Sequence, residues 1–152
     1  MDPLPLRVLC VDDNRDAADS EAMLLELCGC EIEACYDGAS ALAAALRFGP
    51  DACLIDFNMP GMDGCELARR LRAWRRGQPV YLVAVTAYGS DAAREETAAA
   101  GFDMHVVKPV DWVQLSLALA DVERSRGRAE RLQRSHLVAS GAGRGGQARA
   151  TR

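Results

Sequence analysis

The sequence lacks any apolar run long enough to cross a membrane. One of its longest runs, Val80 to Val85, has six residues, whereas a membrane-spanning helix needs about 20. Residues 1–5 contain no basic stretch followed by an apolar one, so no secretory signal is predicted. We therefore expect a protein with no membrane partner that stays in the cytoplasm.

The sequence also has little lysine and few cysteine motifs of the kind that bind metals. Lys108 is the only lysine among 18 basic residues. Its compact ammonium differs physically from the planar guanidinium of arginine, so that this position differs from the other basic positions. Among the six cysteines, Cys10 and Cys53 lie inside apolar runs, and a reducing compartment disfavours disulfides. We interpret the cysteines as small core residues. The Cys-Gly-Cys motif at residues 28–30 is too short for a zinc site without further ligands and is interpreted as a helix cap.

Charge is distributed unevenly along the chain. The 152 residues carry a formal net charge of −4, but residues 1–122 hold 20 acidic against 10 basic side chains, and residues 123–152 hold 8 arginines against 2 acids. Because an acidic body repels a duplex, we expect no nucleic-acid partner. A cationic tail of this kind is usually solvated. The length suits one compact domain.

Short apolar runs alternate with longer segments of helical periodicity. Runs of this kind are typical of strands buried on both faces, and parallel neighbours need helical crossovers. The pattern predicts a doubly wound α/β domain over residues 5–122, with helices on both faces of a parallel sheet. The predicted strands are 7–11, 31–36, 52–57, 80–86 and 104–108. Each is followed by a predicted helix: the first ends at residue 29, the second covers 38–48, the third covers 63–75 and stops near 77, the fourth runs from 90 to 101, and the fifth begins after 111.

The first and last helices have recognisable apolar faces. In the first, Ala18, Ala22 and Leu25 follow helical spacing, which predicts a helix that ends at Gly29. The last has one stripe that can cover the sheet and a second that is either extra core or a contact for a neighbouring molecule. The first stripe is Trp112, Leu115, Leu119 and Val122, and the second is Val113, Leu117 and Ala120. Residues 123–152 are predicted to be an Arg/Gly-rich tail, a helix extension followed by disorder.

Polar side chains follow four of the predicted strands at their carboxyl ends, where parallel sheets bind ligands. Three carboxylates brought together there would repel, each pair at about 5 Å costing on the order of 3 kcal/mol. A divalent cation offsets that repulsion, and clustered carboxylates with backbone carbonyls suit Mg²⁺. With the metal present, Asp56 can act as a carboxylate nucleophile toward a phosphoryl donor. The residues concerned are Asp12, Asp13, Asp56, Asn58, Thr86 and Lys108.

Four motifs together resemble the signature of two-component response-regulator receiver domains. They are Val11-Asp12-Asp13-Asn14, the run from Asp56 to Gly64, Thr86-Ala87 and Val107-Lys108-Pro109, and they occur in the family's order and spacing. The resemblance implies a flavodoxin-like (βα)5 fold with strand order 2-1-3-4-5. It covers residues 5 to about 122, and the details at residues 12–20 and 101–105 are similar to receivers found on hybrid sensor kinases.

The resemblance also assigns roles. It implies that Asp56 is the phosphoacceptor, that Asp13, Asp56 and the Asn58 carbonyl ligate Mg²⁺ directly, and that Asp12 acts mainly through water. Thr86 becomes the switch hydroxyl and Lys108 the cation that pairs with the phosphoryl group, followed by a cis peptide at Pro109. The family implies a switch rather than an enzyme, with Mg²⁺-dependent self-phosphorylation and self-dephosphorylation as its only chemistry. The phosphoryl group would come from a histidine kinase or a phosphotransfer protein.

One position departs from the family pattern. His105 stands three residues before Lys108, where many receivers have Tyr or Phe. An aromatic residue there normally swings inward as the Thr hydroxyl moves, so Tyr88 is the other candidate for this switching role. We expect His105 to make the output face sensitive to pH, because imidazole titrates near neutrality.

Other interpretations make different predictions from the same residues. A flavin-binding module of the same topology is disfavoured, because the adjacent acids at 12 and 13 would repel the flavin phosphate. A phosphohydrolase of the haloacid-dehalogenase type is disfavoured as well, because it needs an Asp-x-Asp pattern on its first strand. A degenerate receiver that acts by protein contact alone is the main alternative. A homodimer through the fourth helix, fifth strand and fifth helix is also open. No further output domain fits into residues 123–152, which favours a stand-alone receiver.

Overall fold

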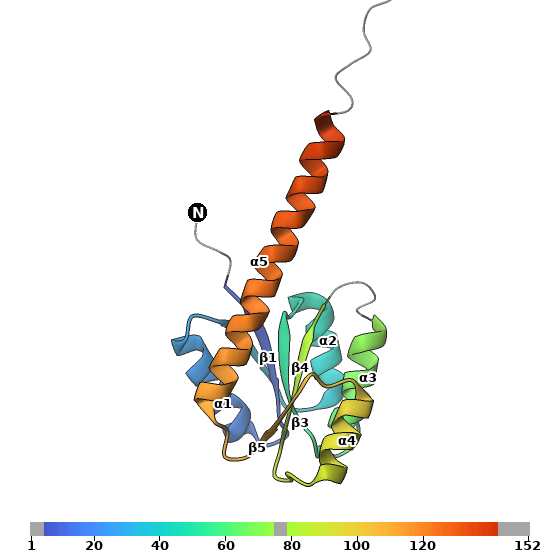
Figure 1. Cartoon of the computed structure of the whole chain (residues 1–152). Coiled ribbons are helices and arrows are strands. Elements are labelled where there is room, and N and C mark those ends of the chain that lie inside the picture. The colour runs from blue at the N-terminus through green and yellow to red at the C-terminus, as the bar shows by residue number, and fades with distance from the viewer. Residues whose placement is uncertain (1–4, 75–78, 143–152) are drawn as a thin grey trace, which may run out of the picture.

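The computed structural model describes residues 5–74 and 79–142 (Figure 1). In these residues five parallel strands alternate with five helices, and the sheet order β2-β1-β3-β4-β5 confirms the predicted fold. The elements are β1 (Arg7–Val11), α1 (Arg15–Leu27), β2 (Glu31–Cys35), α2 (Gly38–Phe48), β3 (Ala52–Asp56), α3 (Gly64–Trp74), β4 (Tyr81–Thr86), α4 (Asp91–Ala100), β5 (Met104–Val107) and α5 (Trp112–Ala142). The predicted extension of the third helix to residues 75–77 lies outside the described residues.

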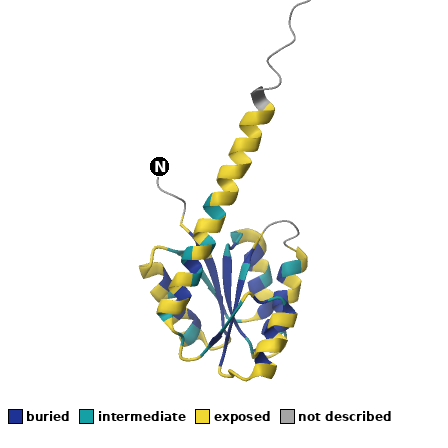
Figure 2. Ribbon diagram, in the orientation of Figure 1, coloured by how far each residue is buried: buried dark blue, intermediate teal, exposed yellow. Residues whose placement is uncertain are grey.

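Helices cover both faces of the sheet because its strands are apolar on both sides. Successive residues of a strand point to opposite faces, so Val8 and Cys10 join one buried cluster and Leu9 and Val11 join the other. The first cluster packs under α1 and α5, and the second packs under α2, α3 and α4. Figure 2 shows the strands as the most deeply buried part of the molecule.

Local sequence fixes where several helices begin and end. The side chains of Asn14, Asp37 and Ser90 each accept a hydrogen bond from a backbone N–H three residues on, as N-cap residues do. At the other end, Gly49 and Gly101 adopt the left-handed conformation that terminates α2 and α4. These caps place the helix ends where the sequence predicts them.

The buried face of α1 contains a carboxyl group. Ala18 and Leu25 are buried, and the residue between them on the inner face is Glu21, which is 8% exposed, whereas Ala22 is only half-buried. Positions three and four residues along a helix both lie on the same face. The helix that the spacing of Ala18, Ala22 and Leu25 predicts is thus confirmed, but Glu21 rather than Ala22 completes its inner face.

Helix α5 begins as a covering helix and continues beyond the sheet. Leu115 and Leu119 are buried, whereas Val113 and Leu117 are 72% and 65% exposed, so the second stripe is not extra core. The contact with a neighbouring molecule stays a prediction. The helix runs on to Ala142 and projects from the domain (Figure 1). Residues 143–152, where disorder is predicted, lie outside the described residues. Within the described ranges no helix is apolar enough over sufficient length to span a membrane.

The cysteines divide into two groups. Cys10, Cys35, Cys53 and Cys65 are buried, in agreement with the interpretation of core residues. The motif at residues 28–30 departs from it, because Cys28 is exposed and Cys30 is half-buried. The cap interpretation holds for this motif: Cys28 is the C-cap of α1, and Gly29 follows with a φ of 91°.

Candidate functional site

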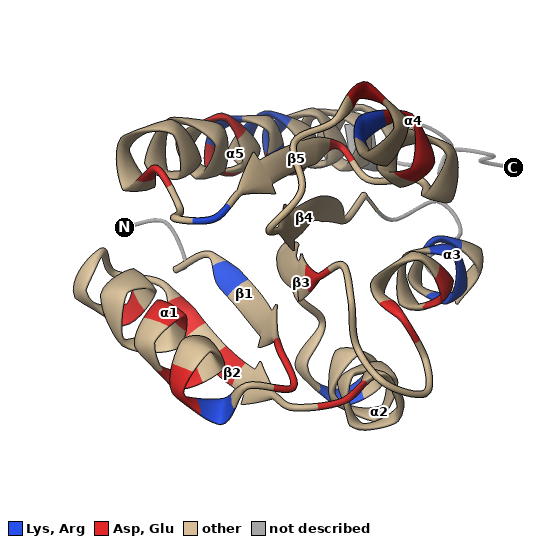
Figure 3. Cartoon of the chain, turned by 90° about the horizontal axis from the view of Figure 1, so that it is seen from below, with Lys and Arg blue, Asp and Glu red and all other residues tan. Residues whose placement is uncertain are grey.

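The polar residues predicted from the sequence meet at the carboxyl edge of the sheet. Asp12 follows β1, Asp56 ends β3, Thr86 ends β4 and Lys108 follows β5. Since all strands are parallel, these ends lie at one edge. Seen from that side in Figure 3, acidic positions mark the ends of β1 and β3 in the middle of the molecule.

Three carboxylates lie close enough to share one cation. One oxygen each from Asp12, Asp13 and Asp56 lie within 4.8 Å of one another. Asp12 is 2% exposed and Asp56 is 9% exposed, whereas Asp13 faces solvent. An all-oxygen set with one open side fits Mg²⁺, which keeps several waters and binds through few carboxylates. The residues present therefore fit the predicted metal.

Lys108 supplies the positive charge on the protein side. Its Nζ lies 3.3 Å from Asp12 Oδ2 and 4.0 Å from Asp56 Oδ1. Burial lowers the pKa of this amine, but the carboxylates of Asp12 and Asp56 outweigh it, so that the pKa is raised. The backbone N–H of Lys108 donates to the Thr86 carbonyl at 2.7 Å, and the Lys108–Pro109 peptide is cis, as the family resemblance implies. One ammonium thus faces several carboxyl groups.

Asp56 has an unusual protonation equilibrium. Burial, followed by the nearby charge of Asp12, raises its pKa to about 6, while Lys108 and the Asn58 N–H act in the opposite direction. The Asn58 N–H donates only a long bond to Asp56 Oδ1, at 3.4 Å. A carboxylate with little hydrogen bonding in a buried position keeps lone pairs available for another partner. This is the property that a nucleophile or metal ligand needs.

Glu21 is the site residue that the sequence does not reveal. Its pKa is raised to about 7, mainly by burial and then by the charge of Asp12, with Lys108 acting in the opposite direction. No acidic motif contains it, and its charge argues against a core position. The only available signal is its spacing of three residues from Ala18 and four from Leu25, which puts it on the face that α1 turns to the sheet.

Thr86 lies with its hydroxyl at the same edge. It is 1% exposed, and its Oγ1 accepts a hydrogen bond from the Tyr88 N–H at 3.1 Å. The hydroxyl proton is thus available for a further acceptor. Its assignment as a switch, and that of the Asn58 carbonyl as a metal ligand, stay predictions.

The two other predicted switch residues are connected to each other. His105 Nε2 lies 2.9 Å from the Tyr88 carbonyl, and its Nδ1 lies 3.0 Å from Thr97 Oγ1. The Tyr88 side chain is 60% exposed. The imidazole therefore joins β5 to the loop after β4 and to α4, which an aromatic hydrocarbon ring at position 105 would not do. The switching role and the pH sensitivity predicted for this face stay predictions.

Gly64 allows α3 to start against the nucleophile's strand. A Cβ at this position would lie 2.5 Å from the Asp56 carbonyl oxygen and 3.1 Å from Phe57 Cα. Both neighbours are backbone atoms at the end of β3 and cannot rotate away. Glycine is therefore required here by close approach, and any side chain would displace the segment that carries Asp56.

Solved structures with the same architecture define the class of protein. The chemotaxis protein CheY4 of Vibrio cholerae superposes with a TM-score of 0.72 at 29% identity, covering 78% of this chain and 99% of that one. A CheY-like receiver domain of Methanospirillum hungatei gives a TM-score of 0.74 at 27% identity, covering 83% and 99%. The fold is thus that of CheY-like receivers. The family description of the response regulator receiver domain matches residues 8–120, and the chain belongs to that family.

Curated relatives carry this domain in longer proteins. The transcriptional regulatory protein PrrA of Mycobacterium tuberculosis is 36% identical over 121 residues, which are 80% of this chain and 51% of PrrA. The sensor protein GacS of Pseudomonas syringae is 35% identical over 113 residues, 72% of this chain and 12% of GacS. The chain thus spans about half the length of the regulator. Receiver domains of two-component systems are signalling switches rather than classical enzymes, and they interact with histidine kinases or phosphotransfer proteins.

Proposed function

We propose that this receiver accepts a phosphoryl group on Asp56, in the presence of Mg²⁺, and that the change alters its binding to a protein partner. The observation that carries the proposal is the group of three carboxylate oxygens within 4.8 Å of one another, one of which belongs to the buried Asp56. Only a cation or a proton relieves that arrangement. A carboxylate so placed can attack phosphorus once its charge is offset.

Each residue has a part in the transfer. An Asp56 oxygen forms the new bond to phosphorus as the bond to the donor's leaving group breaks. The Lys108 ammonium, 4.0 Å from Asp56 Oδ1, pairs with a phosphoryl oxygen, and the Thr86 hydroxyl donates to another. Asp13, Asp56 and the Asn58 carbonyl would hold Mg²⁺, with Asp12 acting through water. When bound, the metal offsets the charge on the transferring group.

The donor is a phosphorylated histidine of a kinase or a phosphotransfer protein. The sensor protein GacS contains a segment 35% identical to this chain, which supports a place in a phosphorelay. The output would pass through α4, β5 and α5, where His105 contacts both Thr97 and the loop after β4. Contact between two copies through this face is part of the proposal.

Incubation with acetyl phosphate and Mg²⁺, followed by intact mass spectrometry, tests the proposal. The parent protein is expected to gain the mass of one phosphoryl group, and Asp56→Asn is expected to gain none. Glu26→Gln is the matched control, because Glu26 is exposed in the last turn of α1, at the opposite end of that helix from Asp12 and Asp13. Addition of EDTA should prevent the gain in the parent.

Lys108→Arg sharpens the test. It keeps the positive charge but replaces the ammonium with a larger planar group, so we expect slower phosphorylation with an intact fold. If Asp56→Asn gained the same mass as the parent, the phosphoacceptor would be a residue other than Asp56. If the parent gained none while Mg²⁺ still bound, the chain would be a receiver that acts by contact alone.

A further inference from the structure

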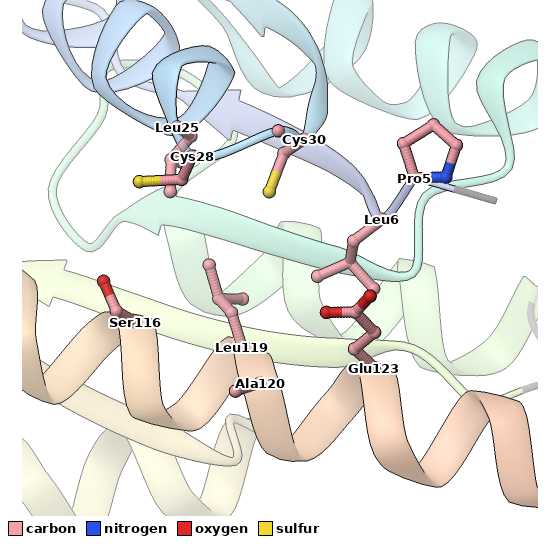
Figure 4. A pocket seen from close by; sticks show the side chains of 10 residues that line it. Pro5, Leu6, Leu25, Cys28, Cys30, Ser116, Leu119, Ala120 and Glu123 are labelled. Atoms are coloured by element: carbon pink, nitrogen blue, oxygen red, sulfur yellow. The ribbon is translucent and has the colours of Figure 1, made fainter. Parts of the chain in front are cut away.

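Two thiols flank Gly29 at the end of α1 opposite the acidic site. Cys28 caps α1 and Cys30 directly precedes β2. Both line a cavity of about 390 Å³ between this turn and α5. In Figure 4 the Cys30 sulfur points into the space between the turn and α5, on which Glu123 is carried. The remaining walls are mostly apolar, with Leu6, Leu25 and Leu119 among them.

We propose that Cys28 and Cys30 form a dithiol modification site, which small disulfides such as oxidised glutathione convert reversibly into an intramolecular disulfide. Both thiols are free in the structure. Two residues that are two positions apart lie at most about 7 Å apart at their Cα atoms, which is close to the range of about 4.4–6.8 Å seen in disulfides. The cross-link therefore needs rotation of side chains and little movement of the backbone.

The turn itself favours the cross-link. Gly29 has a φ of 91°, so the chain turns between the two cysteines, and both residues line the same cavity. A Cβ at Gly29 would meet no atom within 4 Å, and glycine is needed here for the backbone angle alone. Because Cys28 is exposed, its side chain can change rotamer without disturbing the core.

Access separates this pair from the other cysteines. Cys10 and Cys53 are 0% exposed, Cys65 is 4% and Cys35 is 6% exposed. A dissolved disulfide reaches none of these without local unfolding. Oxidation of the native protein is therefore expected to be confined to residues 28 and 30.

The two thiols have different parts in the reaction. The Cys28 sulfur attacks the small disulfide, forming a mixed disulfide and releasing one small thiol. The Cys30 sulfur then attacks the Cys28 sulfur, forming the internal disulfide and releasing the second small thiol. In total the two cysteines lose two hydrogen atoms and the small disulfide gains them. The second step is intramolecular and is favoured by the high effective concentration of neighbouring groups.

Charge in the cavity supports this order. Burial, then the neighbouring Cys28 and Glu123, raise the pKa of Cys30. A thiol that resists ionisation is the poorer first nucleophile. Cys28, in contrast, is accessible from solvent.

The site is independent of phosphorylation. Helix α1 has 13 residues, so the acidic residues before its first turn and the thiols after its last turn are separated by about 20 Å along the axis. Because strained or exposed disulfides are the more easily reduced ones, the cross-link is expected to be reversed by dithiothreitol.

Incubation of the reduced full chain with oxidised glutathione, followed by intact mass and peptide mapping, tests the proposal. The parent is expected to lose the mass of two hydrogen atoms, with the link mapped to Cys28 and Cys30. Cys30→Ser should instead accumulate one glutathionyl group on Cys28, and Cys28→Ser should remain largely unmodified. Cys65→Ser is the matched control and should behave as the parent does.

Three results would overturn the proposal. They are loss of two hydrogen atoms by Cys28→Ser, a stable glutathionyl adduct on the parent, and a disulfide between two chains on a non-reducing gel. Differential alkylation of the unmutated parent gives a second measurement that does not depend on how the variants fold. Before oxidation, residues 28 and 30 should be alkylated ahead of the other four cysteines, and afterwards neither should react.

Discussion

The two ends of the sheet handle charge in opposite ways. At the amino end, arginines and acids are paired: Arg126 contacts Asp51, and Arg72 contacts both Asp103 and the Val80 and Gly101 carbonyls. At the carboxyl end, several carboxyl groups share one lysine, Lys108. The amino end is satisfied by its own residues. The carboxyl end is not, and it gains stability when something from solution binds.

The carboxyl groups at the two ends also differ in their surroundings. At the carboxyl end the pKa values of Asp56 and Glu21 are raised, to about 6 and about 7. At the amino end, Asp103 accepts hydrogen bonds from Arg72 and from the Leu82 N–H, and Asp51 accepts from Arg126 and from the Arg7 N–H. The comparison teaches that the ion pairs at the amino end stabilise the fold, whereas the carboxylates at the carboxyl end repel one another until a cation binds.

The largest expected effect comes from Glu21. Raising its pKa from 4.5 to about 7 penalises the folded state at pH 8 by roughly 3 kcal/mol, at about 1.4 kcal/mol per unit. Glu21→Leu should therefore stabilise the metal-free protein by about that amount in urea denaturation at pH 8. Glu26→Leu, at an exposed position of the same helix, should change stability little. Equal effects of the two substitutions would contradict a buried, ionised Glu21.

The second prediction removes a side chain from the ion-paired amino end of the sheet. Arg72→Met removes the donor to two carbonyls and to Asp103, and we expect a loss of about 2 kcal/mol, since the side chain is partly exposed. Arg70→Met is the control, because its pair with Glu66 is exposed and is worth at most about 0.5 kcal/mol. Similar losses for both, measured by urea denaturation, would show that the Arg72 network does not hold the amino end.

The third prediction concerns Asp56 and pH. The group has a pKa raised to about 6 when folded and an ordinary value of 3.8, so its penalty is absent below pH 3.8, grows between these values and is complete above pH 6. The shift alone amounts to about 3 kcal/mol at pH 7.5, and solvent at the open side of the carboxylate cluster screens about half of it. Asp56→Asn should therefore stabilise the metal-free protein by about 1.5 kcal/mol at pH 7.5 and little at pH 4. A gain of the same size at both pH values would contradict the raised pKa.

The smallest expected effect is that of the metal itself. Mg²⁺ at ten times its dissociation constant should stabilise the parent by about 1.4 kcal/mol at pH 7.5, seen as a higher midpoint of thermal unfolding. The gain should fall as pH drops through 6, because a protonated Asp56 is a poor ligand. Asp13→Asn should reduce it as well. Stabilisation that persists undiminished at pH 5 would place the ion elsewhere.

Much of the architecture could be predicted because its signals are local. Consecutive apolar residues such as those of β4 indicate a strand buried on both faces, and Gly49 and Gly101 mark helix ends by the backbone angle they adopt. The convergence of Asp12, Asp56 and Lys108 followed from parallel strands ending at one edge. These predictions need only the period of the sequence and the direction of the chain.

The misses have a common physical origin. Glu21 was overlooked because charge normally excludes a residue from the core, and its burial follows from how α1 packs against the sheet. The position of Cys28 and Cys30 at a cavity depends on how closely α5 approaches the α1–β2 turn, which the sequence does not encode locally. Both cases involve packing between elements far apart in the chain.

The C-terminal half of helix α5 projects from the domain and packs against little of it. Gly127 is the last half-buried residue of the helix, and residues 128–140 are all exposed. Single helices of this length are marginal in water and fray without a cooperative transition. On heating, the helical signal in far-ultraviolet circular dichroism should therefore decline gradually before the domain unfolds. A molecule that binds the projecting segment would abolish this gradual decline.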